Sequence, residues 1–204
     1  MVICGVDEAG RGPLAGPVTA AAVVLSSSFP RDELGDSKRL SPARRAELEP
    51  LIKNTAWLWG VGWASHREID GLNILKASHL AMERAVRALL AESRLRGRGA
   101  VELDPAMLHG IVDGSITPSL PISAECVVKA DASVPEVMAA SILAKEARDR
   151  WMIAYDRIEP NYEFYQHKGY PTRRHRALIE CYGPSAIHRH SFSSKQATCA
   201  FDAP

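Results

Sequence analysis

The sequence predicts an α/β fold, with a central sheet flanked by helices. Short apolar runs of strand length lie mostly in the first two-thirds of the chain, and longer segments with helical spacing separate and follow them. The length is a second observation, because 204 residues correspond to about 1.4 domains at ~150 residues per domain. We therefore expect one main domain with a small appendage.

The first part of the chain alternates predicted strands and helices. Residues 2–7 and 18–25 are apolar runs of strand length, joined by a turn rich in glycine and proline. A Ser-Pro pair, typical of a helix N-cap and its first helical position, predicts a helix over 42–54. Tryptophan and valine alternate with leucine and glycine over 57–63, which predicts a third strand.

The middle of the chain continues the same pattern. A helix is predicted over 73–93, with its apolar residues on one stripe. Residues 108–112 and 126–129 are short strand candidates. Apolar and small residues at intervals of three and four then predict a long helix over 133–155. Strands therefore come early, helices dominate late, and crossovers connect them.

The sequence changes character after residue 159. Tyrosine and phenylalanine are interleaved with basic residues, and residues 164–195 contain six lysines and arginines against one glutamate, a local charge of +5. We therefore predict a main domain over 1–158 and a small basic portion over 159–204. An ordinary solvated charged face is the alternative interpretation.

The composition is that of a soluble globular protein. The net charge is +1, so overall basicity does not indicate nucleic acid and any such partner has to bind a local patch. No apolar run approaches the ~20 residues of a membrane span, and the N-terminus is acidic where a secretory signal is basic. The four cysteines are dispersed, as in reduced proteins. We expect a cytoplasmic monomer.

Acidic side chains stand where predicted strands end. Asp7 and Glu8 end the first strand, Asp113 follows an apolar run, and Asp131 lies between a strand and a helix. Such positions meet at the carboxyl edge of an α/β sheet, although an aspartate before glycine or serine is also a common turn former or N-cap. Adjacent residues of a regular strand point to opposite faces. Glu8 therefore requires a bend, or acts through its backbone or a water.

Four clustered carboxylates predict a site for divalent cations. At 4 Å, each pair repels by about 4 kcal/mol at an effective dielectric constant near 20. Two divalent ions would neutralise the four charges, and oxygen ligands favour Mg²⁺ or Mn²⁺ over zinc. Two such ions about 3.5–4 Å apart stabilise the attacking and leaving oxygens of phosphoryl transfer.

Two other binding motifs are weak. Residues 10–15 fit a dinucleotide-binding pattern, but proline and a β-branched run follow in place of a helix. Cysteines and histidines near the C-terminus have a spacing that is not typical of zinc sites. We favour a phosphate contact for Arg189 and its basic neighbours.

Several blocks resemble, in order, those of bacterial ribonuclease HII, a type 2 ribonuclease H family. The blocks are Gly5 to Pro17, Asp36-Ser37-Lys38, Val112-Asp113-Gly114, Lys129-Ala130-Asp131, Ala139 to Lys145, His167 to Thr172 and His188 to Phe192. They span nearly the whole chain.

The resemblance implies a ribonuclease H-like fold, with a mixed sheet and a helical C-terminal portion, here 159–204, that binds substrate. It implies an endonuclease that cleaves RNA in RNA–DNA hybrids and cuts duplex DNA on the 5′ side of an embedded ribonucleotide, leaving 3′-hydroxyl and 5′-phosphate ends. The four metal-binding acids of the family fall on Asp7, Glu8, Asp113 and Asp131. The alternatives are an inactive hybrid-binding module of the same fold and another two-metal nuclease.

The resemblance also implies substrate contacts. Gly10, Arg11 and Gly12 would contact the ribose 2′-hydroxyl and neighbouring phosphates, and Tyr170 would lie at the RNA–DNA junction. Further expected phosphate contacts are Lys38, Lys168, Arg189 and Lys145, of which the last could merely pair with Asp149. Residues 196–201 faintly resemble a sliding-clamp peptide, against the simpler interpretation of a frayed terminus.

Overall fold

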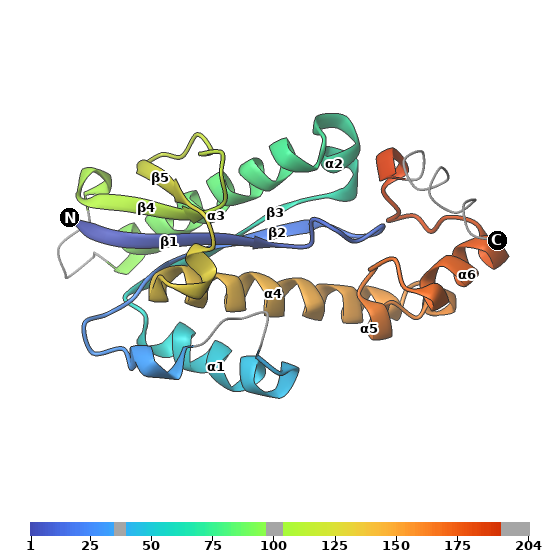
Figure 1. The fold of residues 1–204 in the computed structure, drawn as a ribbon, viewed down its shortest axis with the longest axis horizontal. Coiled ribbons are helices and arrows are strands. Elements are labelled where there is room, and N and C mark those ends of the chain that lie inside the picture. The colour runs from blue at the N-terminus through green and yellow to red at the C-terminus, as the bar shows by residue number, and fades with distance from the viewer. Residues whose placement is uncertain (35–39, 97–103, 193–204) are drawn as a thin grey trace.

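The computed structural model describes residues 1–34, 40–96 and 104–192. These residues form one mixed five-stranded sheet with helices on both faces (Figure 1). The strands are β1 (Val2–Ala9), β2 (Val18–Val24), β3 (Leu58–Ala64), β4 (Leu108–Asp113) and β5 (Ser123–Val127). The helices are α1 (Pro42–Thr55), α2 (His66–Leu72), α3 (Ile74–Arg96), α4 (Pro135–Asp156), α5 (Phe164–His167) and α6 (Arg173–Tyr182).

The strand order in the sheet is β3-β2-β1-β4-β5. Strands β1 and β2 form an antiparallel pair, as do β2 and β3, whereas β4 runs parallel to both β1 and β5. The carboxyl ends of β1, β4 and β5 therefore lie at the same edge of the sheet, which is where acidic residues were predicted to meet.

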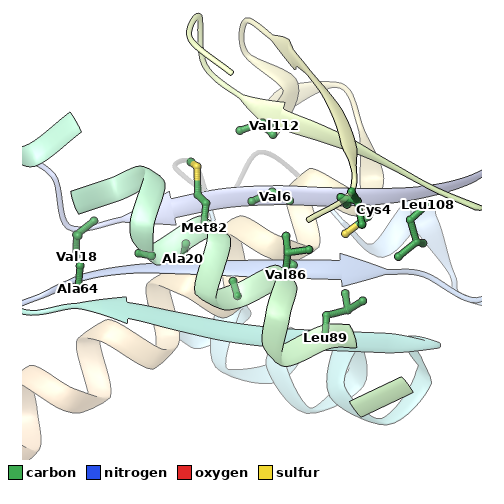
Figure 2. Close-up of a cluster of buried hydrophobic side chains, with 14 of the residues drawn as sticks. Cys4, Val6, Val18, Ala20, Ala64, Met82, Val86, Leu89, Leu108 and Val112 are labelled. Atoms are coloured by element: carbon green, nitrogen blue, oxygen red, sulfur yellow. The ribbon is translucent and has the colours of Figure 1, made fainter. Parts of the chain in front are cut away.

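Two apolar cores hold the helices to the sheet. On one face, α3 packs its apolar stripe on the sheet, and Figure 2 shows Met82, Val86 and Leu89 of this helix in one cluster with Val6 of β1 and Val18 of β2. On the other face, α4 packs against alternate residues of β2, and α1 packs beside α4 in the same core. The mixed sheet flanked by helices confirms the predicted fold class.

Helix α4 approaches β1 closely because β1 has a glycine at the contact. A Cβ atom on Gly5 would lie 2.1 Å from the backbone carbon of Glu136, a distance that real contacts do not show. This close packing fixes the helix that faces Asp7, two residues further along β1.

Most elements lie where the sequence predicts them, with two corrections. Strand β5 begins at Ser123 and ends at Val127, earlier than the predicted 126–129. The segment before α3 contains a separate short helix, α2, that was not predicted. Ser65 and Glu68 form a reciprocal capping box at its start, and this Ser-x-x-Glu pattern was the available signal.

The C-terminal region packs on the second half of α4. Met152 of α4 shares a buried cluster with Tyr162, Phe164, Leu178 and Ile187, and Figure 1 shows α5 and α6 at the end of α4. The region is helical as predicted, while the boundary at residue 158 stays a prediction. Among the described residues, no helix is long and apolar enough to cross a membrane.

Candidate active site

Three aspartates come together at the shared strand edge. Asp7 lies on β1, Asp113 is the last residue of β4, and Asp131 lies in a short 3-10 helix, 130–132, between β5 and α4. Each offers a carboxylate oxygen, and these oxygens lie within 4.8 Å of one another. Asp7 and Asp131 are only 4 % and 3 % exposed.

Backbone groups fix the aspartates in place. The amide of Glu8 donates to Oδ1 of Asp7 at 2.7 Å, and the amide of Ala130 donates to Oδ1 of Asp113 at 2.9 Å. The second bond joins the end of β4 to the 3-10 helix that carries Asp131. Main-chain amides therefore contribute to the orientation of the Asp7 and Asp113 carboxylates.

Glu8 reaches the site from the opposite face of β1, as the strand geometry requires. Its side chain lines a pocket of about 170 Å³ together with Asp113, Ser78 and His79. Glu8 is not part of the three-aspartate cluster. Its Oε1 accepts from Nη1 of Arg11 at 3.1 Å, while its buried Oε2 has no hydrogen-bond partner among the described residues. No bend of the strand is needed to bring Glu8 beside Asp113.

The electrostatics of this cluster suit a cation. Burial raises the pKa of Asp7 well above its ordinary value, and the charge of Glu8 raises it further. Burial also raises the pKa of Glu8, against the opposing charge of Arg11. Divalent ions would relieve both effects, and the unpartnered Glu8 oxygen is a free ligand atom. The residues therefore fit the predicted divalent-metal site.

The segment after β1 brings a turn beside the carboxylates. Gly10 has φ of +99°, and a Cβ there would lie 2.1 Å from Nε of Arg148. Gly10 is buried, whereas Arg11 and Gly12 are exposed. The ion pair between Arg11 and Glu8 ties this predicted substrate loop directly to the acidic site.

Arg189 corrects the sequence prediction. Its side chain is only 2 % exposed, and all three guanidinium nitrogens donate to main-chain carbonyls of residues 10–17. A guanidinium whose donors are taken by the protein interior does not face a phosphate. Part of the C-terminal positive charge is also neutralised at the surface, because Arg174 pairs with Glu163.

The other predicted substrate residues surround Tyr170. Nζ of Lys145 lies 5.4 Å from the centre of the Tyr170 ring and 2.7 Å from a carboxylate oxygen of Asp149, the pairing that was the alternative to a phosphate contact. Nζ of Lys168 donates to the carbonyl of Tyr165, and burial lowers the pKa of Lys168. Lys38 and the clamp-like residues 196–201 lie outside the described residues.

Three residues near the site were not singled out from sequence. Ser141 of α4 hydrogen-bonds the Asp7 carboxylate, and His79 of α3 lines the pocket with Glu8. Arg148 of α4 is fully buried beside the loop that follows β1. An arginine on the apolar stripe of a predicted helix was the available signal for Arg148, because charges there require partners.

Comparison with known proteins identifies the family. The ribonuclease HII family model matches residues 4–195. Ribonuclease HII of Nitrosospira multiformis is 48 % identical over 191 residues, 94 % of this chain and 89 % of that protein. The Treponema denticola enzyme of the same name is 49 % identical, over 95 % of this chain and 99 % of that protein.

The fold agrees with that family. The crystal structure of ribonuclease H2 from Pyrococcus horikoshii OT3 superposes with a TM-score of 0.69 at 24 % identity, covering 97 % of this chain and 96 % of that one. The family model, the relatives and the acidic edge of the sheet lead to one conclusion. This chain belongs to the ribonuclease HII family of endoribonucleases, which act on RNA–DNA hybrids.

Proposed function

We propose that this enzyme cuts both the RNA strand of hybrids and the 5′ side of single ribonucleotides in duplex DNA, by a mechanism that uses two Mg²⁺ or Mn²⁺ ions. The observation that carries the proposal is one juxtaposition. The three-aspartate cluster lies beside Glu8, and Glu8 is paired with Arg11 of the exposed turn. The exposed turn, which can distinguish ribose from deoxyribose, thus lies next to the carboxylates that can hold cations.

The acidic residues have distinct roles in this proposal. Asp7, Asp113 and Asp131 would hold the ions, and Glu8 would support one of them through its unpartnered oxygen. When bound, the ions activate the attacking water and stabilise the departing 3′-oxygen, so that the products carry 3′-hydroxyl and 5′-phosphate ends. Oxygen ligands alone suit both Mg²⁺ and Mn²⁺.

The turn and Tyr170 would select the substrate. The 2′-hydroxyl is the group that separates RNA from DNA, and exposed backbone at Arg11 and Gly12 can approach it closely. A Cβ on Gly12 would lie 3.9 Å from the Tyr170 ring, so turn and ring are neighbours. The ring could then stack on the deoxyribose that adjoins the ribonucleotide.

The test uses a DNA duplex that contains one ribonucleotide, an all-DNA duplex and a continuous RNA–DNA hybrid. Each is incubated with the enzyme in Mg²⁺, in Mn²⁺ and in chelator. We expect metal-dependent cutting of the hybrid, and of the single-ribonucleotide duplex only on its 5′ side. Binding without cutting would instead support the inactive module, and cutting of all-DNA duplex would support another nuclease.

A further inference from the structure

Two buried arginines hydrogen-bond the main-chain carbonyls of the loop between β1 and β2. The Arg189 guanidinium makes five hydrogen bonds to carbonyl oxygens of this loop. They run from Nε to Gly16 (2.9 Å), from Nη1 to Arg11 (3.1 Å) and Pro13 (2.7 Å), and from Nη2 to Gly10 (2.7 Å) and Pro17 (3.1 Å).

Arg148 of α4 also hydrogen-bonds carbonyls of this loop. It is fully buried, and it donates to the carbonyls of Pro17 at 2.9 Å, Ala15 at 3.1 Å and Lys168 at 3.0 Å. The last bond ties the loop to the turn that precedes Tyr170. The two arginines thus connect the turn after β1 with the segment that carries the predicted junction tyrosine.

Burying two guanidinium groups carries a large desolvation cost. Among the described residues, neither guanidinium forms an ion pair with a carboxylate. Burial lowers the pKa of Arg189 to about 9 and that of Arg148 to about 10. Two buried cations are thus held by the carbonyl dipoles of one loop and not by carboxylates, so what they fix is the shape of that loop.

The geometry of the peptide bond shows which way the amides of this loop point. In a planar trans peptide, the N–H points opposite to the carbonyl of the preceding residue, and the described residues contain no cis peptide. Because Arg189 draws the carbonyls of Gly10 and Arg11 inward, the amides of Arg11 and Gly12 point away from it. Both residues are exposed, and among the described hydrogen bonds neither amide has a protein acceptor.

The remaining amides of the loop support this assignment. The carbonyls of Pro13 and Ala15 are also drawn to the arginines, and the amides of the same two peptides donate to the protein. Leu14 N–H donates to the carbonyl of Gly169 at 2.8 Å, and Gly16 N–H donates to that of Ile187 at 2.9 Å. The protein therefore accepts from these two inner amides, whereas the exposed amides of Arg11 and Gly12 have no such acceptor among the described hydrogen bonds.

We propose that Arg189 and Arg148 are positioning residues, which fix the loop so that the amides of Arg11 and Gly12 are presented to an oxygen of the ribonucleotide. The assignment rests on the proposed function, in which this turn distinguishes ribose from deoxyribose. Neither arginine touches the substrate. Lysine cannot replace either one, because a single ammonium lacks the planar fork that reaches several carbonyls at once.

The first experiment compares Arg189→Lys with Leu89→Ala. Leu89 is buried in the α3 core, so its truncation destabilises the fold without touching the loop. Binding is measured in Ca²⁺ for a duplex with one ribonucleotide and for the same duplex in DNA. We expect the ratio of the two dissociation constants to fall at least threefold toward one in Arg189→Lys and to stay at the wild-type value in Leu89→Ala. Equal behaviour of the two variants overturns the proposal.

Arg148→Lys keeps the proposal testable if Arg189→Lys does not fold, because Arg148 makes fewer bonds to the loop. We expect it to lower kcat/KM on the single-ribonucleotide duplex at least tenfold. An unchanged kcat/KM in a folded Arg148→Lys enzyme overturns the proposal.

Hydrogen exchange separates this proposal from the proposed function. The amides of Leu14 and Gly16 are expected to exchange at least tenfold faster in either arginine variant, and at the wild-type rate relative to global stability in Leu89→Ala. Wild-type exchange rates in the arginine variants overturn the positioning role. If the wild-type enzyme itself binds both duplexes equally, it is the proposed reading of the 2′-hydroxyl that fails.

Discussion

The imidazoles of His175 and His188 face each other in the C-terminal region, with their Nε2 atoms 3.1 Å apart. The amide of Ser185 donates to Nδ1 of His188 at 2.7 Å, so the proton of neutral His188 is on Nε2. His175 then accepts at Nε2 and donates from Nδ1 to the carbonyl of Tyr170 at 2.9 Å. The pair is satisfied only when both rings are neutral, and it holds the main chain of Tyr170.

This histidine pair predicts an acid-sensitive fold. The pKa of each ring is lowered from 6.5 to about 4, chiefly by burial and in smaller part by the nearby charge of His167. Between pH 6.5 and about 4, the unfolded chain binds protons that the folded chain excludes. The free energy of unfolding is therefore expected to fall as the pH drops through this window, by an amount on the order of several kcal/mol. Urea unfolding at steps of half a pH unit measures it.

A substitution identifies the source of that dependence. His188→Gln removes one titrating group and is expected to flatten the stability profile between pH 6.5 and 4. His109→Gln is the matched control, since His109 lies on β4 beside Glu125 of the edge strand β5, away from the pair. Equal profiles for the two variants would contradict the assignment.

The elements of the fold could be predicted because their signals are local. The Ser41 cap, the alternation in β3 and the apolar stripe of α3 each depend on residues close in sequence. The acidic edge could be placed for the same reason, because strand ends are local features and parallel strands end together.

The burial of Arg189 could not be predicted from its neighbours in the sequence. It lies in a basic stretch, which favours a phosphate contact, but the fold returns this stretch to the loop after β1, where Ala15 and His188 form a bridge. Partners more than 170 positions away take all its donors. Local charge indicates which residue types are present, whereas burial depends on the tertiary fold.

Asp113→Asn tests the acidic cluster. The amide oxygen of asparagine can still accept from the amide of Ala130, so the end of β4 should keep its geometry. Losing one negative charge should lower kcat at least 10³-fold, because the Asp113 carboxylate would hold the metal ions that turnover requires. The affinity for the hybrid should change less than threefold, because other residues contact the nucleic acid. Glu125→Gln, an exposed change on β5, is the control and should keep full turnover. Full activity of Asp113→Asn would contradict the proposed mechanism.

Tyr170→Ala tests the choice between substrates. The ring lies near the Lys145 ammonium and the Arg148 guanidinium, at 5.4 and 5.8 Å from its centre. Loss of aromatic stacking is worth about 1–3 kcal/mol, so the preference for a single ribonucleotide over a continuous hybrid should fall roughly tenfold. Competition between the two labelled substrates measures the preference. Tyr165→Ala, at an exposed ring nearby, should leave it unchanged.

Gly5→Ala tests whether the close approach of α4 to β1 positions the acidic site. The added Cβ would meet the backbone of Glu136 and Val137 at 2.1–2.3 Å, so α4 has to move away from β1. Overpacking of this kind costs about 1–3 kcal/mol, and here it displaces Ser141 from the Asp7 carboxylate. We expect a lower melting temperature together with a kcat reduced more than tenfold.

Gly71→Ala is the matched substitution, because a Cβ at that position in α2 meets no atom within 4 Å. Alanine in place of glycine in a helix is expected to raise stability by up to about 1 kcal/mol, with kcat unchanged. If Gly5→Ala lost stability but kept wild-type kcat at a temperature where it is fully folded, the contact between α4 and β1 would support the fold alone. A kcat loss confined to Gly5→Ala would instead mean that the distance between this helix and strand sets the geometry of the carboxylates.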